Sequence, residues 1–368
     1  MKIAQRFENI ELSLIRQINA LATPLSTNLG IGEPNIEPDA TFRELAKRAT
    51  TASWHYSANA GQLSLRKKLA GVEGALTGDP NEICVTAGTQ EGLFAIFQAY
   101  VDPGDEVLVP NPGFVSYATL ARICGATPVP YNLEPPDWQI EKLPITSKTK
   151  LIVVNSPSNP LGSIVSEDKL REIANAGPLV VSDEIYHEIW YDAPPPSMRG
   201  MSKNVIAVDG LSKSHSMTGL RLGWIHAHPD VMKPIITAHQ YIATCASVFS
   251  QALAEAIFDA TEWNAQWLDG VRQQFRAQRD AALFAVEREM EVKIPQPRGA
   301  FYLFVPSPVC DTLSFAKTLA TDAAVLVIPG AAFGSNGEGF VRISYAASVE
   351  EVSTGIERIG RWLRSAGR

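Results

Sequence analysis

The stretch Val205–Ala227 reads VIAVDGLSKSHSMTGLRLGWIHA. Two apolar runs in it, Val205–Val208 and Leu222–Ala227, flank a segment rich in Ser, Gly and Thr that contains Lys213. Short apolar runs bounded by turn-forming residues are typical of buried β-strands. The stretch therefore predicts a strand whose carboxyl end leads into a tight polar loop carrying Lys213.

The same alternation of short apolar runs and helical patterns extends over residues 80–230. Further apolar runs occur at Glu106–Val109, Leu151–Val154 and Leu179–Ser182. Strands that alternate with helices predict an α/β fold, in which helices cover a mostly parallel sheet. Ligands of such sheets bind outside the carboxyl ends of the strands. We therefore expect the chemistry in the loops that follow these runs.

The last third of the chain predicts a second, smaller unit of the α+β type. Glu262–Glu291 has the pattern of one long amphipathic helix. Short strand patterns follow at Phe301–Val305, Val325–Ile328 and Phe340–Ser344, and a final helix begins at about Val349.

The length of 368 residues favours about two domains. The N-terminal segment, with a short helix expected at Ile10–Leu21, is too short to fold alone and is expected to pack on the smaller unit. We predict a large domain of residues 34–270 and a small domain formed by residues 1–33 and 271–368.

The composition limits the classes of function. The chain is 45% hydrophobic and 19% charged with a net charge of −7, as in a folded globular protein without a basic surface for nucleic acid. The cysteines lie far apart and no histidine has zinc-site spacing, so we expect no metal. The polar start Met1–Glu8 and the lack of an apolar run of about 18 residues predict a cytoplasmic protein without membrane contacts.

Lys213 allows two interpretations. A lysine in a polar loop, taken alone, is more often a solvated charge. Lysine is also the side chain that forms Schiff bases with carbonyl cofactors, because its pKa falls readily when it is desolvated near other cations. Arg221, eight residues further along the chain, is a candidate for such a cation.

The residues around Lys213 resemble the pattern of a known family. Ser212–Gly223 fits S-K-x-x-x-x-T-G-x-R-x-G, which is similar to the lysine signature of the class I/II pyridoxal-phosphate-dependent aminotransferases of fold type I. That resemblance implies a large domain with a mixed, mainly parallel sheet and a small α+β domain. Other motifs similar to those of the family recur in the same order at Asn28–Pro34, Tyr56–Arg66, Gly88–Gln90, Asn155–Gly162, Ser182–Tyr186 and Val341–Tyr345.

A phosphate site at the start of one helix is implied by the resemblance. The segment Val85–Gln90 leads into a helix expected at Glu91–Tyr100, and the unpaired N–H groups at a helix N-terminus attract a phosphate. Taken alone, the segment could equally be an ordinary strand–helix turn. The residues implied to bind the cofactor there are Gly88, Thr89, Gln90, Ser212 and Arg221.

Four residues are implied to hold the cofactor ring. Asp183 would face the pyridine nitrogen and keep it protonated, which makes the ring an electron sink. Tyr186 and Asn159 would hydrogen-bond the phenolic oxygen, and Phe114 would stack on the ring. Taken singly, a strand-end Asp is usually a turn or helix cap, and Asn159 is usually an Asn-Pro turn. For Phe114 the less favoured alternative is a core aromatic.

The resemblance also implies a substrate site and a partner. Arg342 would bind the α-carboxylate of the substrate, because a guanidinium forms bidentate hydrogen bonds with a carboxylate, although an arginine in a strand can also be an edge-strand charge. Gly32 and Asn159 are the other implied substrate-binding residues. Tyr56 would reach the cofactor phosphate of a neighbouring subunit, so we expect a homodimer with shared active sites.

The implied activity is that of an aminotransferase in amino-acid metabolism. It moves the α-amino group of an amino acid to a 2-oxo acid by a ping-pong mechanism, in which pyridoxal 5'-phosphate starts as a Lys213 aldimine and becomes pyridoxamine phosphate. Lys213, Asp183 and Tyr186 are the implied catalytic residues. Lyases, decarboxylases and cyclising synthases on the same scaffold remain alternatives. A sensor fused to a DNA-binding domain is disfavoured because about thirty residues precede Gly30.

Several positions bear on the substrate. Leu161, Leu220 and Gly210 stand where family members often have Thr, Trp and Ser, which leaves the pocket shape and the phosphate contacts open. In one branch of the family a lysine in the phosphate-loop motif recognises acidic substrates, and Gln90 occupies the matching position. Because a neutral amide cannot replace that charge, we expect aspartate to be a poorer donor than neutral or aromatic amino acids. An arginine from the partner subunit, as in other members of the family, is the alternative source of the charge. Ile10–Ile15 supplies either an apolar pocket wall or plain packing of the small domain.

Overall fold

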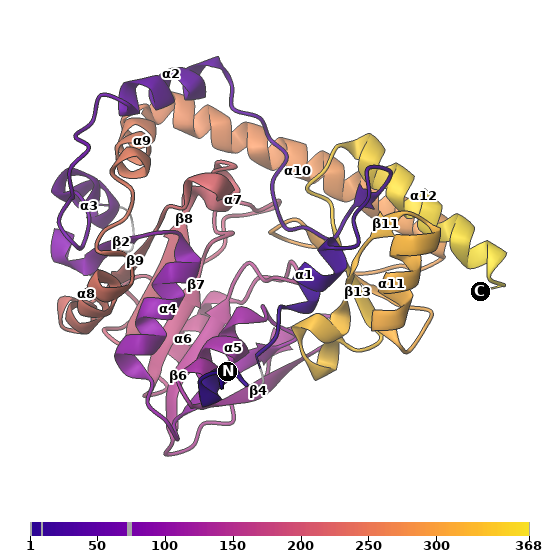
Figure 1. Ribbon diagram of the computed structural model, residues 1–368, viewed down its shortest axis with the longest axis horizontal. Helices are drawn as coiled ribbons and strands as arrows, with labels where there is room; N and C mark the ends of the chain where they lie inside the picture. Colours follow the sequence, from indigo (N-terminus) through magenta and orange to yellow (C-terminus); the bar gives the residue numbers. More distant parts are fainter. Residues whose placement is uncertain (1, 9, 72–75, 368) are drawn as a thin grey trace.

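The computed structural model describes residues 2–8, 10–71 and 76–367. It contains a large sheet with its helices at one end of the molecule and a smaller sheet with its own helices at the other (Figure 1). Helix α10 (Thr261–Met290) runs from one unit to the other and packs against α12 (Val349–Ser365). The predicted α/β fold with a smaller α+β companion is confirmed.

The large sheet has the strand order β2-β9-β8-β7-β6-β3-β4-β5. Strands β8, β7, β6, β3 and β4 run parallel, whereas β9 and β5 pair antiparallel with their neighbours. The sheet is therefore mixed and mainly parallel, as predicted. Its strands are β2 (Ile83–Thr86), β3 (Glu106–Asn111), β4 (Thr127–Glu134), β5 (Gln139–Ile140), β6 (Thr149–Asn155), β7 (Leu179–Asp183), β8 (Val205–Gly210) and β9 (Gly223–Ala227).

Two apolar cores cover the two faces of this sheet, because successive side chains of a strand point to opposite faces. In β6, Leu151 and Val153 pack into one core, and Ile152 and Val154 pack into the other. Strands buried on both faces consist of continuous apolar runs, which explains why the sequence marks them clearly. The helices that contribute to the core of Leu151 are α4 (Thr89–Tyr100), α5 (Ser116–Ile123) and α8 (Pro229–Ala243).

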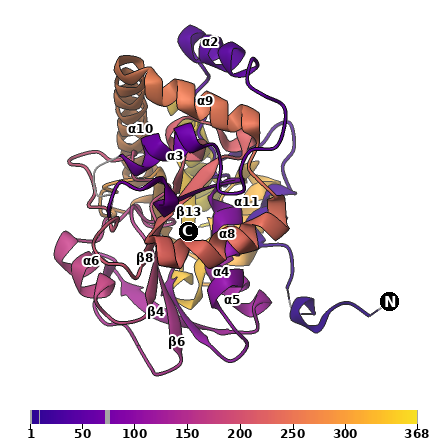
Figure 2. The ribbon, with the colours of Figure 1, turned by 90° about the vertical axis from the view of Figure 1, so that its left-hand side faces the viewer.

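The other helices of the large unit frame the sheet. Figure 2 shows α2, α9 and α3 stacked above the sheet, and the N-terminal segment projecting away from the rest of the molecule. The helices that frame the sheet are α2 (Ala40–Ala49), α3 (Leu63–Ala70), α6 (Glu167–Ala174), α7 (Leu211–Ser214) and α9 (Val248–Asp259), with 3-10 turns η1 (Gln5–Phe7), η2 (Pro80–Glu82) and η3 (Thr218–Leu220).

Within the described ranges, no helix is both long and apolar enough to cross a membrane.

The smaller sheet has the order β10-β13-β12, so β13 (Phe340–Ser344) is its central strand. A separate pair, β1 (Thr27–Asn28) with β11 (Val325–Leu326), attaches the N-terminal segment to this unit. Residue 270 falls inside α10, and the predicted domain limits at 34 and 270 stay predictions. The remaining elements are β10 (Tyr302–Pro306), β12 (Ile328–Pro329), α11 (Thr312–Asp322), η4 (Gly330–Phe333) and η5 (Ser335–Gly337).

Three local predictions need correction. The single strand expected at Val325–Ile328 is two strands, because β11 pairs with β1 and β12 pairs with β13. The helix expected at Ile10–Leu21 is the shorter α1 (Leu14–Asn19), which begins where the Ser13 side chain caps the N–H of Arg16. The expected strand Leu222–Ala227 is present as β9, but it runs antiparallel, a direction that an apolar pattern cannot reveal.

Candidate active site

The parallel strands β6, β7 and β8 end at the same edge of the sheet, and their last residues gather polar groups. At the end of β6, Asn155 donates from Nδ2 to the Asp183 carbonyl at 2.9 Å and accepts from the Asn159 N–H at 2.8 Å. Strand β7 ends at Asp183, and β8 ends at Gly210, directly before the short helix α7 that carries Lys213. The structure thus brings Asn159, Asp183 and Lys213 to one place.

Asp183 presents a buried carboxylate at this edge. Its Oδ2 accepts a hydrogen bond from the Tyr117 hydroxyl at 2.7 Å, and its Oδ1 accepts one from the Ile185 N–H at 3.3 Å. Burial raises the pKa of Asp183 to about 6, while the Tyr117 hydrogen bond acts in the opposite direction. Neither of these donors is a cation, so a cationic group placed against Asp183 would stabilise its charge.

Lys213 faces the N-terminal segment, where its Nζ donates to the Gly32 carbonyl at 2.7 Å. Burial lowers the pKa of Lys213 to about 8; Glu33 opposes this shift, whereas the guanidinium groups of Arg342 and Arg221 add to it. A lysine acts as a nucleophile or a base only through its neutral amine. A pKa near 8 provides that form in a useful fraction at neutral pH.

The N-terminus of α4 and Arg221 together form a candidate anion site. Gly88 caps the helix with a φ of 82°, and Arg221 is held by a hydrogen bond from Nη1 to the Thr218 carbonyl at 2.7 Å. A Cβ atom at Gly88 would lie 2.6 Å from Arg221 Nη2, so the close approach requires glycine. Free N–H groups next to a guanidinium suit a phosphate. Thr89 is the first residue of α4, and Ser212 is buried in α7.

Gln90 lies in the first turn of α4, and Phe114 lies in the loop that precedes α5. The exposed Gln90 side chain accepts a hydrogen bond from the Ser116 hydroxyl at 3.0 Å. The half-buried Phe114 ring meets the ring of Tyr117 edge-on, with centroids 5.6 Å apart and planes at 83°. Phe114 therefore lies at the margin of the apolar core and next to the residue that holds Asp183.

Arg342 lies on the central strand β13 and is buried, so the interpretation as an edge-strand charge is wrong. Its Nη1 donates to the Asn159 side-chain oxygen at 2.9 Å, and its Nη2 donates to the Gly30 carbonyl at 2.5 Å. Its Nε has no partner within the described part of the chain. Burial lowers the pKa of Arg342, and neither of its acceptors is an anion. A buried guanidinium of this kind requires an anionic ligand.

Known proteins resemble this chain in sequence and in structure. A family model described as "Aminotransferase class I and II" matches residues 26–359. The chain belongs to the class I and II aminotransferases. Aspartate aminotransferase of Pyrococcus abyssi is 33% identical to it, with 99% of each chain covered. Aromatic-amino-acid aminotransferase 2 of Thermococcus litoralis is 32% identical, again with 99% of each chain covered.

Solved structures agree with this assignment. The structure of aspartate aminotransferase from Thermus thermophilus with maleate has a TM-score of 0.90 and 30% identity, and it covers 98% of this chain and 99% of that chain. The aromatic aminotransferase from Pyrococcus horikoshii has a TM-score of 0.85 and 32% identity, and the match covers 96% and 99%. The enzyme is therefore an aminotransferase of fold type I that acts on an amino acid and a 2-oxo acid.

Aminotransferases of this family depend on pyridoxal phosphate, and the residues of this aminotransferase fit that group. The Gly88 turn and Arg221 form a cradle that a single Cβ atom would fill. Lys213 has a depressed pKa, as a carbonyl-binding amine requires. Asp183 is a buried acid whose hydrogen-bond donors in the described part of the chain are neutral, although the Lys213 amine lies close enough to lower its pKa. The donor set therefore matches a phosphorylated aldehyde with a basic ring nitrogen.

Tyr186 and Gly32 meet at a residue that the motifs do not include. The hydroxyl groups of Tyr186 and Tyr302 are 2.8 Å apart, and both rings are buried. A Cβ atom at Gly32 would collide with the Tyr302 hydroxyl, so Gly32 leaves the space that Tyr302 fills in this aminotransferase. The predicted site residues Tyr186, Gly32, Asn159 and Arg342 thus form one contiguous group around Tyr302.

Tyr56 lies apart from these residues. Its side chain is 86% exposed, next to Trp54, which is 90% exposed. Together with Cys245 and Phe249, both residues line a surface cavity of about 640 Å³. The expectation that Tyr56 serves the site of a neighbouring subunit stays a prediction, because the structure describes one chain of this aminotransferase.

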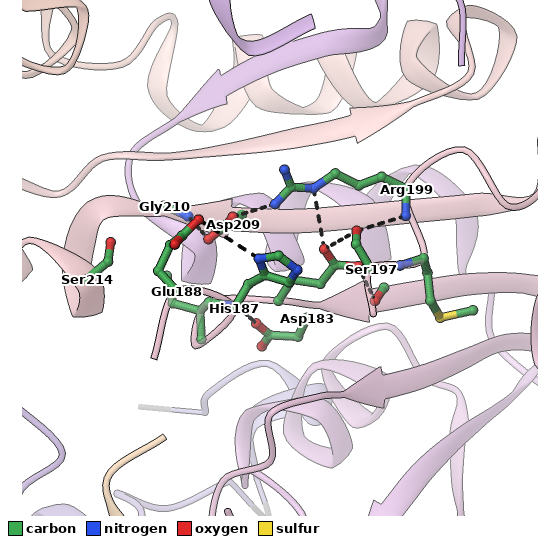
Figure 3. A network of polar contacts seen from close by, with 12 residues as sticks. Asp183, His187, Glu188, Ser197, Arg199, Asp209, Gly210 and Ser214 are labelled. Carbon is green, nitrogen blue, oxygen red and sulfur yellow. Dashed lines mark hydrogen bonds and ion pairs between the residues drawn. The ribbon is translucent and has the colours of Figure 1, made fainter. Parts of the chain in front are cut away.

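A buried network of charged side chains connects the segments at the carboxyl ends of β7 and β8 (Figure 3). Arg199 pairs through Nη2 with Asp209 Oδ2 at 2.5 Å and through Nε with Glu184 Oε2 at 3.3 Å. Asp209 also accepts the Gly210 N–H at 2.7 Å. Because Glu184 follows Asp183 and Asp209 precedes the Lys213 loop, Arg199 ties together the two segments that carry these residues.

Sequence reasoning missed several residues of the site. Tyr117 follows Phe114 by three residues, a spacing that places both on one side of a helical turn, so the motif offered a weak signal for it. Asn155 is the last residue of an apolar run, as Asp183 is, and this position was a usable signal. Arg199 and Tyr302 had no such signal, because a loop arginine and a strand tyrosine are common in any fold.

Proposed function

We propose that this aminotransferase holds pyridoxal 5'-phosphate at Lys213 and prefers neutral or aromatic amino acids over aspartate as donors. The carrying observation is that two buried ionisable groups near the Lys213 amine, Asp183 and Arg342, have only neutral hydrogen-bond partners among the described residues. When bound, pyridoxal phosphate supplies a protonated ring that stabilises the negative charge left at Cα after proton removal.

The residues around Lys213 divide the binding of the cofactor among them. Gly88, Thr89, Gln90, Ser212 and Arg221 would hold the phosphate at the N-terminus of α4, and Phe114 would stack on the ring. Asp183 would face the ring nitrogen. Tyr186 and Asn159 would donate to the phenolic oxygen, for which the amide of Asn159 is already fixed by its contact with Arg342.

Arg342 would bind the α-carboxylate of the amino acid with Asn159 and Gly32 beside it. Its Nε has no partner in the described part of the chain. A carboxylate bound there would satisfy this donor and neutralise the buried charge. The Lys213 amine would then remove the proton at Cα, because its pKa near 8 allows it to accept and release a proton close to neutral pH.

The proposed preference for neutral donors depends on which cations this subunit can offer to the side chain of the substrate. The guanidinium groups that act on Lys213 are those of Arg342 and Arg221, and both have other roles in the proposed site. Gln90 carries no charge, and its amide oxygen is engaged by Ser116. A side-chain carboxylate would therefore be desolvated without a cation from this subunit, whereas an apolar side chain gains roughly 25 cal/mol per Å² that it buries.

The Ile10–Ile15 segment contributes less to the substrate pocket than to packing. Leu14 and Ile15 pack against the apolar core, and Leu12 is 76% exposed. We therefore assign the segment to the small unit. The pocket wall is proposed to come from the Tyr302 and Phe333 rings, which lie 4.4 Å and 5.0 Å from the Arg342 guanidinium carbon.

Kinetics with a panel of donors test the substrate class. We expect kcat/KM for methionine, phenylalanine and leucine to exceed that for aspartate, with 2-oxoglutarate as acceptor. Reduction by borohydride and peptide mapping test the cofactor site independently, and the label is expected on Lys213. A roughly tenfold preference for aspartate would overturn the substrate class, and a label on another lysine would overturn the cofactor site.

The active unit is proposed to be a homodimer in which Tyr56 reaches the cofactor phosphate of the partner. The exposed rings of Trp54 and Tyr56 and the exposed Ile3 and Phe7 of the projecting N-terminal segment support this proposal, because they form apolar surface outside both cores (Figure 2). Sedimentation and a Tyr56→Phe variant test this proposal, and active monomers would contradict it.

The cytoplasm remains the expected compartment of this aminotransferase.

A further inference from the structure

We propose that Tyr302 is a positioning residue that couples the guanidinium of Arg342 to the Tyr186 hydroxyl, and through that hydroxyl to the phenolic oxygen of the cofactor. The inference rests on the proposed roles of Arg342 and Tyr186. It gives the site a second connection between the carboxylate clamp and the cofactor, beside the direct hydrogen bond from Arg342 to Asn159.

Tyr302 touches both of the residues that it is proposed to connect. It is the first residue of β10 and is 1% exposed. Its hydroxyl lies 2.8 Å from that of Tyr186, and the two rings meet edge-on with centroids 5.7 Å apart. The guanidinium carbon of Arg342 lies 4.4 Å from the centre of the Tyr302 ring. A cation this close to an aromatic ring is attracted to it.

Strand register explains why these groups meet. Strand β10 pairs antiparallel with β13, and Phe304 is opposite Arg342 in that pairing. Tyr302 is two residues from Phe304 and therefore points to the same face of the sheet. The sheet thus fixes Tyr302 beneath Arg342 from the small unit, while Tyr186 approaches from the loop after β7 of the large unit.

The Tyr302 hydroxyl and the Lys213 amine both lie next to Gly32. A side chain at Gly32 would occupy the place of this hydroxyl, and the Gly32 carbonyl accepts the hydrogen bond from Lys213. The titratable and charged groups that face the tyrosine pair are Arg342 on β13, Asp183 at the end of β7 and Tyr345 just after β13. Arg342 is the cation among these three.

Proton counting sets the direction of the hydrogen bonds. Each phenol has one proton to donate, so Tyr186 can donate to the cofactor only if Tyr302 donates to Tyr186. Arg342 lowers the pKa of both phenols, but for Tyr302 its effect is second only to burial, whereas for Tyr186 it ranks behind burial and the two effects of Tyr302. It therefore favours Tyr302 as the donor. A more acidic phenol is the better donor, and consecutive hydrogen bonds strengthen one another.

Occupation of Arg342 should therefore be felt at the cofactor. A substrate carboxylate neutralises the guanidinium, which makes Tyr302 a weaker donor to Tyr186 and makes Tyr186 a weaker donor to the phenolic oxygen. The anionic form of that oxygen then loses stabilisation. The pKa of the bound cofactor is consequently expected to rise when a carboxylate binds, and Tyr302 is expected to carry part of that rise.

The test uses the holoenzyme and the visible absorbance of its cofactor. The absorbance is titrated with pH in the absence and presence of a saturating unreactive carboxylate, either maleate or 3-phenylpropionate. In the parent enzyme, the ligand should raise the pKa of the absorbance change. In Tyr302→Phe, the pKa without ligand should already be higher, by roughly half a pH unit or more, and the rise caused by the ligand should be at most about half of that in the parent.

Three further substitutions, Tyr345→Phe, Tyr186→Phe and Tyr302→His, isolate the path. Tyr345→Phe is the matched control, because the Tyr345 and Tyr191 hydroxyls form another buried pair at 3.0 Å, and Tyr191 retains its hydrogen bond to the Ala300 carbonyl. This variant should titrate as the parent does. In a Tyr186→Phe background, Tyr302→Phe should change neither titration further. Tyr302→His, which keeps a ring donor, should restore part of the ligand-induced rise and replaces Tyr302→Phe if that variant does not fold.

The outcomes separate this inference from the proposed function. An unchanged ligand-induced rise in Tyr302→Phe, or an equal loss in Tyr345→Phe, overturns the role of Tyr302. An additional effect of Tyr302→Phe in the Tyr186→Phe background also overturns it. By contrast, the absence of a visible cofactor band attached to Lys213 in the parent overturns the proposed cofactor site itself.

Discussion

Two neighbouring strands of the large sheet carry buried carboxylates near their ends, and these two carboxylates have different kinds of partner. Asp183 ends β7 and Asp209 precedes the last residue of β8. Burial raises the pKa of each to about 6. Asp209 is paired with Arg199 at 2.5 Å, whereas the donors to Asp183 are a hydroxyl and a backbone N–H.

The difference distinguishes a carboxylate that stabilises the fold, Asp209, from one that is available to a ligand, Asp183. A buried carboxylate with a fixed guanidinium has its charge balanced within the chain, so it can hold strand ends in place without a ligand. Asp183 and Arg342 have no such partner in the described residues, although leaving a buried charge unpaired costs free energy. Charges left unbalanced in this way are the ones that a cofactor or a substrate can complete.

The largest expected effect comes from neutralising Asp183. Asp183→Asn keeps the shape of the side chain but cannot carry a charge, so kcat should fall by about 10³-fold, or about 4 kcal/mol. Steady-state kinetics measure this loss. Asp209→Asn is the matched control on the neighbouring strand, with an expected loss below about tenfold. Asp183→Asn with activity within about tenfold of the parent would contradict the role of Asp183.

Removing Arg199, the cation paired with Asp209, should lower the stability of the fold. Arg199→Met leaves Asp209 and Glu184 buried without their guanidinium, so the free energy of unfolding should fall by about 3–5 kcal/mol. Denaturant titration measures the change. Adding Asp209→Asn should recover much of the loss, since one unbalanced charge is gone. A double variant no more stable than Arg199→Met would show that the two residues are not coupled.

The pH dependence of stability gives a third comparison. The pKa of Asp183 is about 6 in the folded chain and about 4 in an unfolded one, so the folded state holds its proton longer. Its contribution to stability is complete below about pH 4 and is lost as the pH rises through 6. Asp183→Asn does not titrate, so its stability relative to the parent apoprotein should increase by up to about 3 kcal/mol from pH 4 to pH 8. A constant difference across that range would rule out the shifted pKa.

The smallest effect is expected at the donor to Asp183. Tyr117→Phe removes the hydrogen bond that lowers the pKa of Asp183, so the pH range over which the apoprotein loses stability should move to higher pH by about one unit. Tyr131→Phe serves as the control, because the Tyr131 hydroxyl donates to the Val153 carbonyl and not to Asp183. Equal profiles of stability against pH for the two variants would remove Tyr117 from the site.

The sequence predicted those features that depend on short stretches of chain. The strands of the sheet, the loop of Lys213 and the position of Asp183 at a strand end all follow from local apolar runs and the residues that interrupt them. The family resemblance then assigned roles to residues such as Asn159 and Arg342. The structure brings these residues together, and their individual roles stay proposals.

Features that depend on distant partners were out of reach. Tyr117 and Asp183 are 66 residues apart in the sequence, and Tyr186 and Tyr302 are 116 apart. No local pattern distinguishes such a tyrosine from an ordinary core residue. The direction of β9 and the division of the predicted strand at Val325–Ile328 were hidden for the same reason, because each is decided by the strand that pairs with it.

Helix α10 gives the molecule a mechanical property. It has 30 residues and is therefore about 45 Å long. It starts among the rings of Phe42, Trp263 and Trp267 and ends against α12 of the small unit. Gly270 lies within its first half with no atom within 4 Å of the place of a Cβ, and glycine weakens a helix interior by roughly 0.5–1 kcal/mol. Gly270 is therefore the position of α10 with the weakest intrinsic preference for helix, and a change of helix direction at this residue would alter the angle at which the small unit presents Arg342 to Lys213.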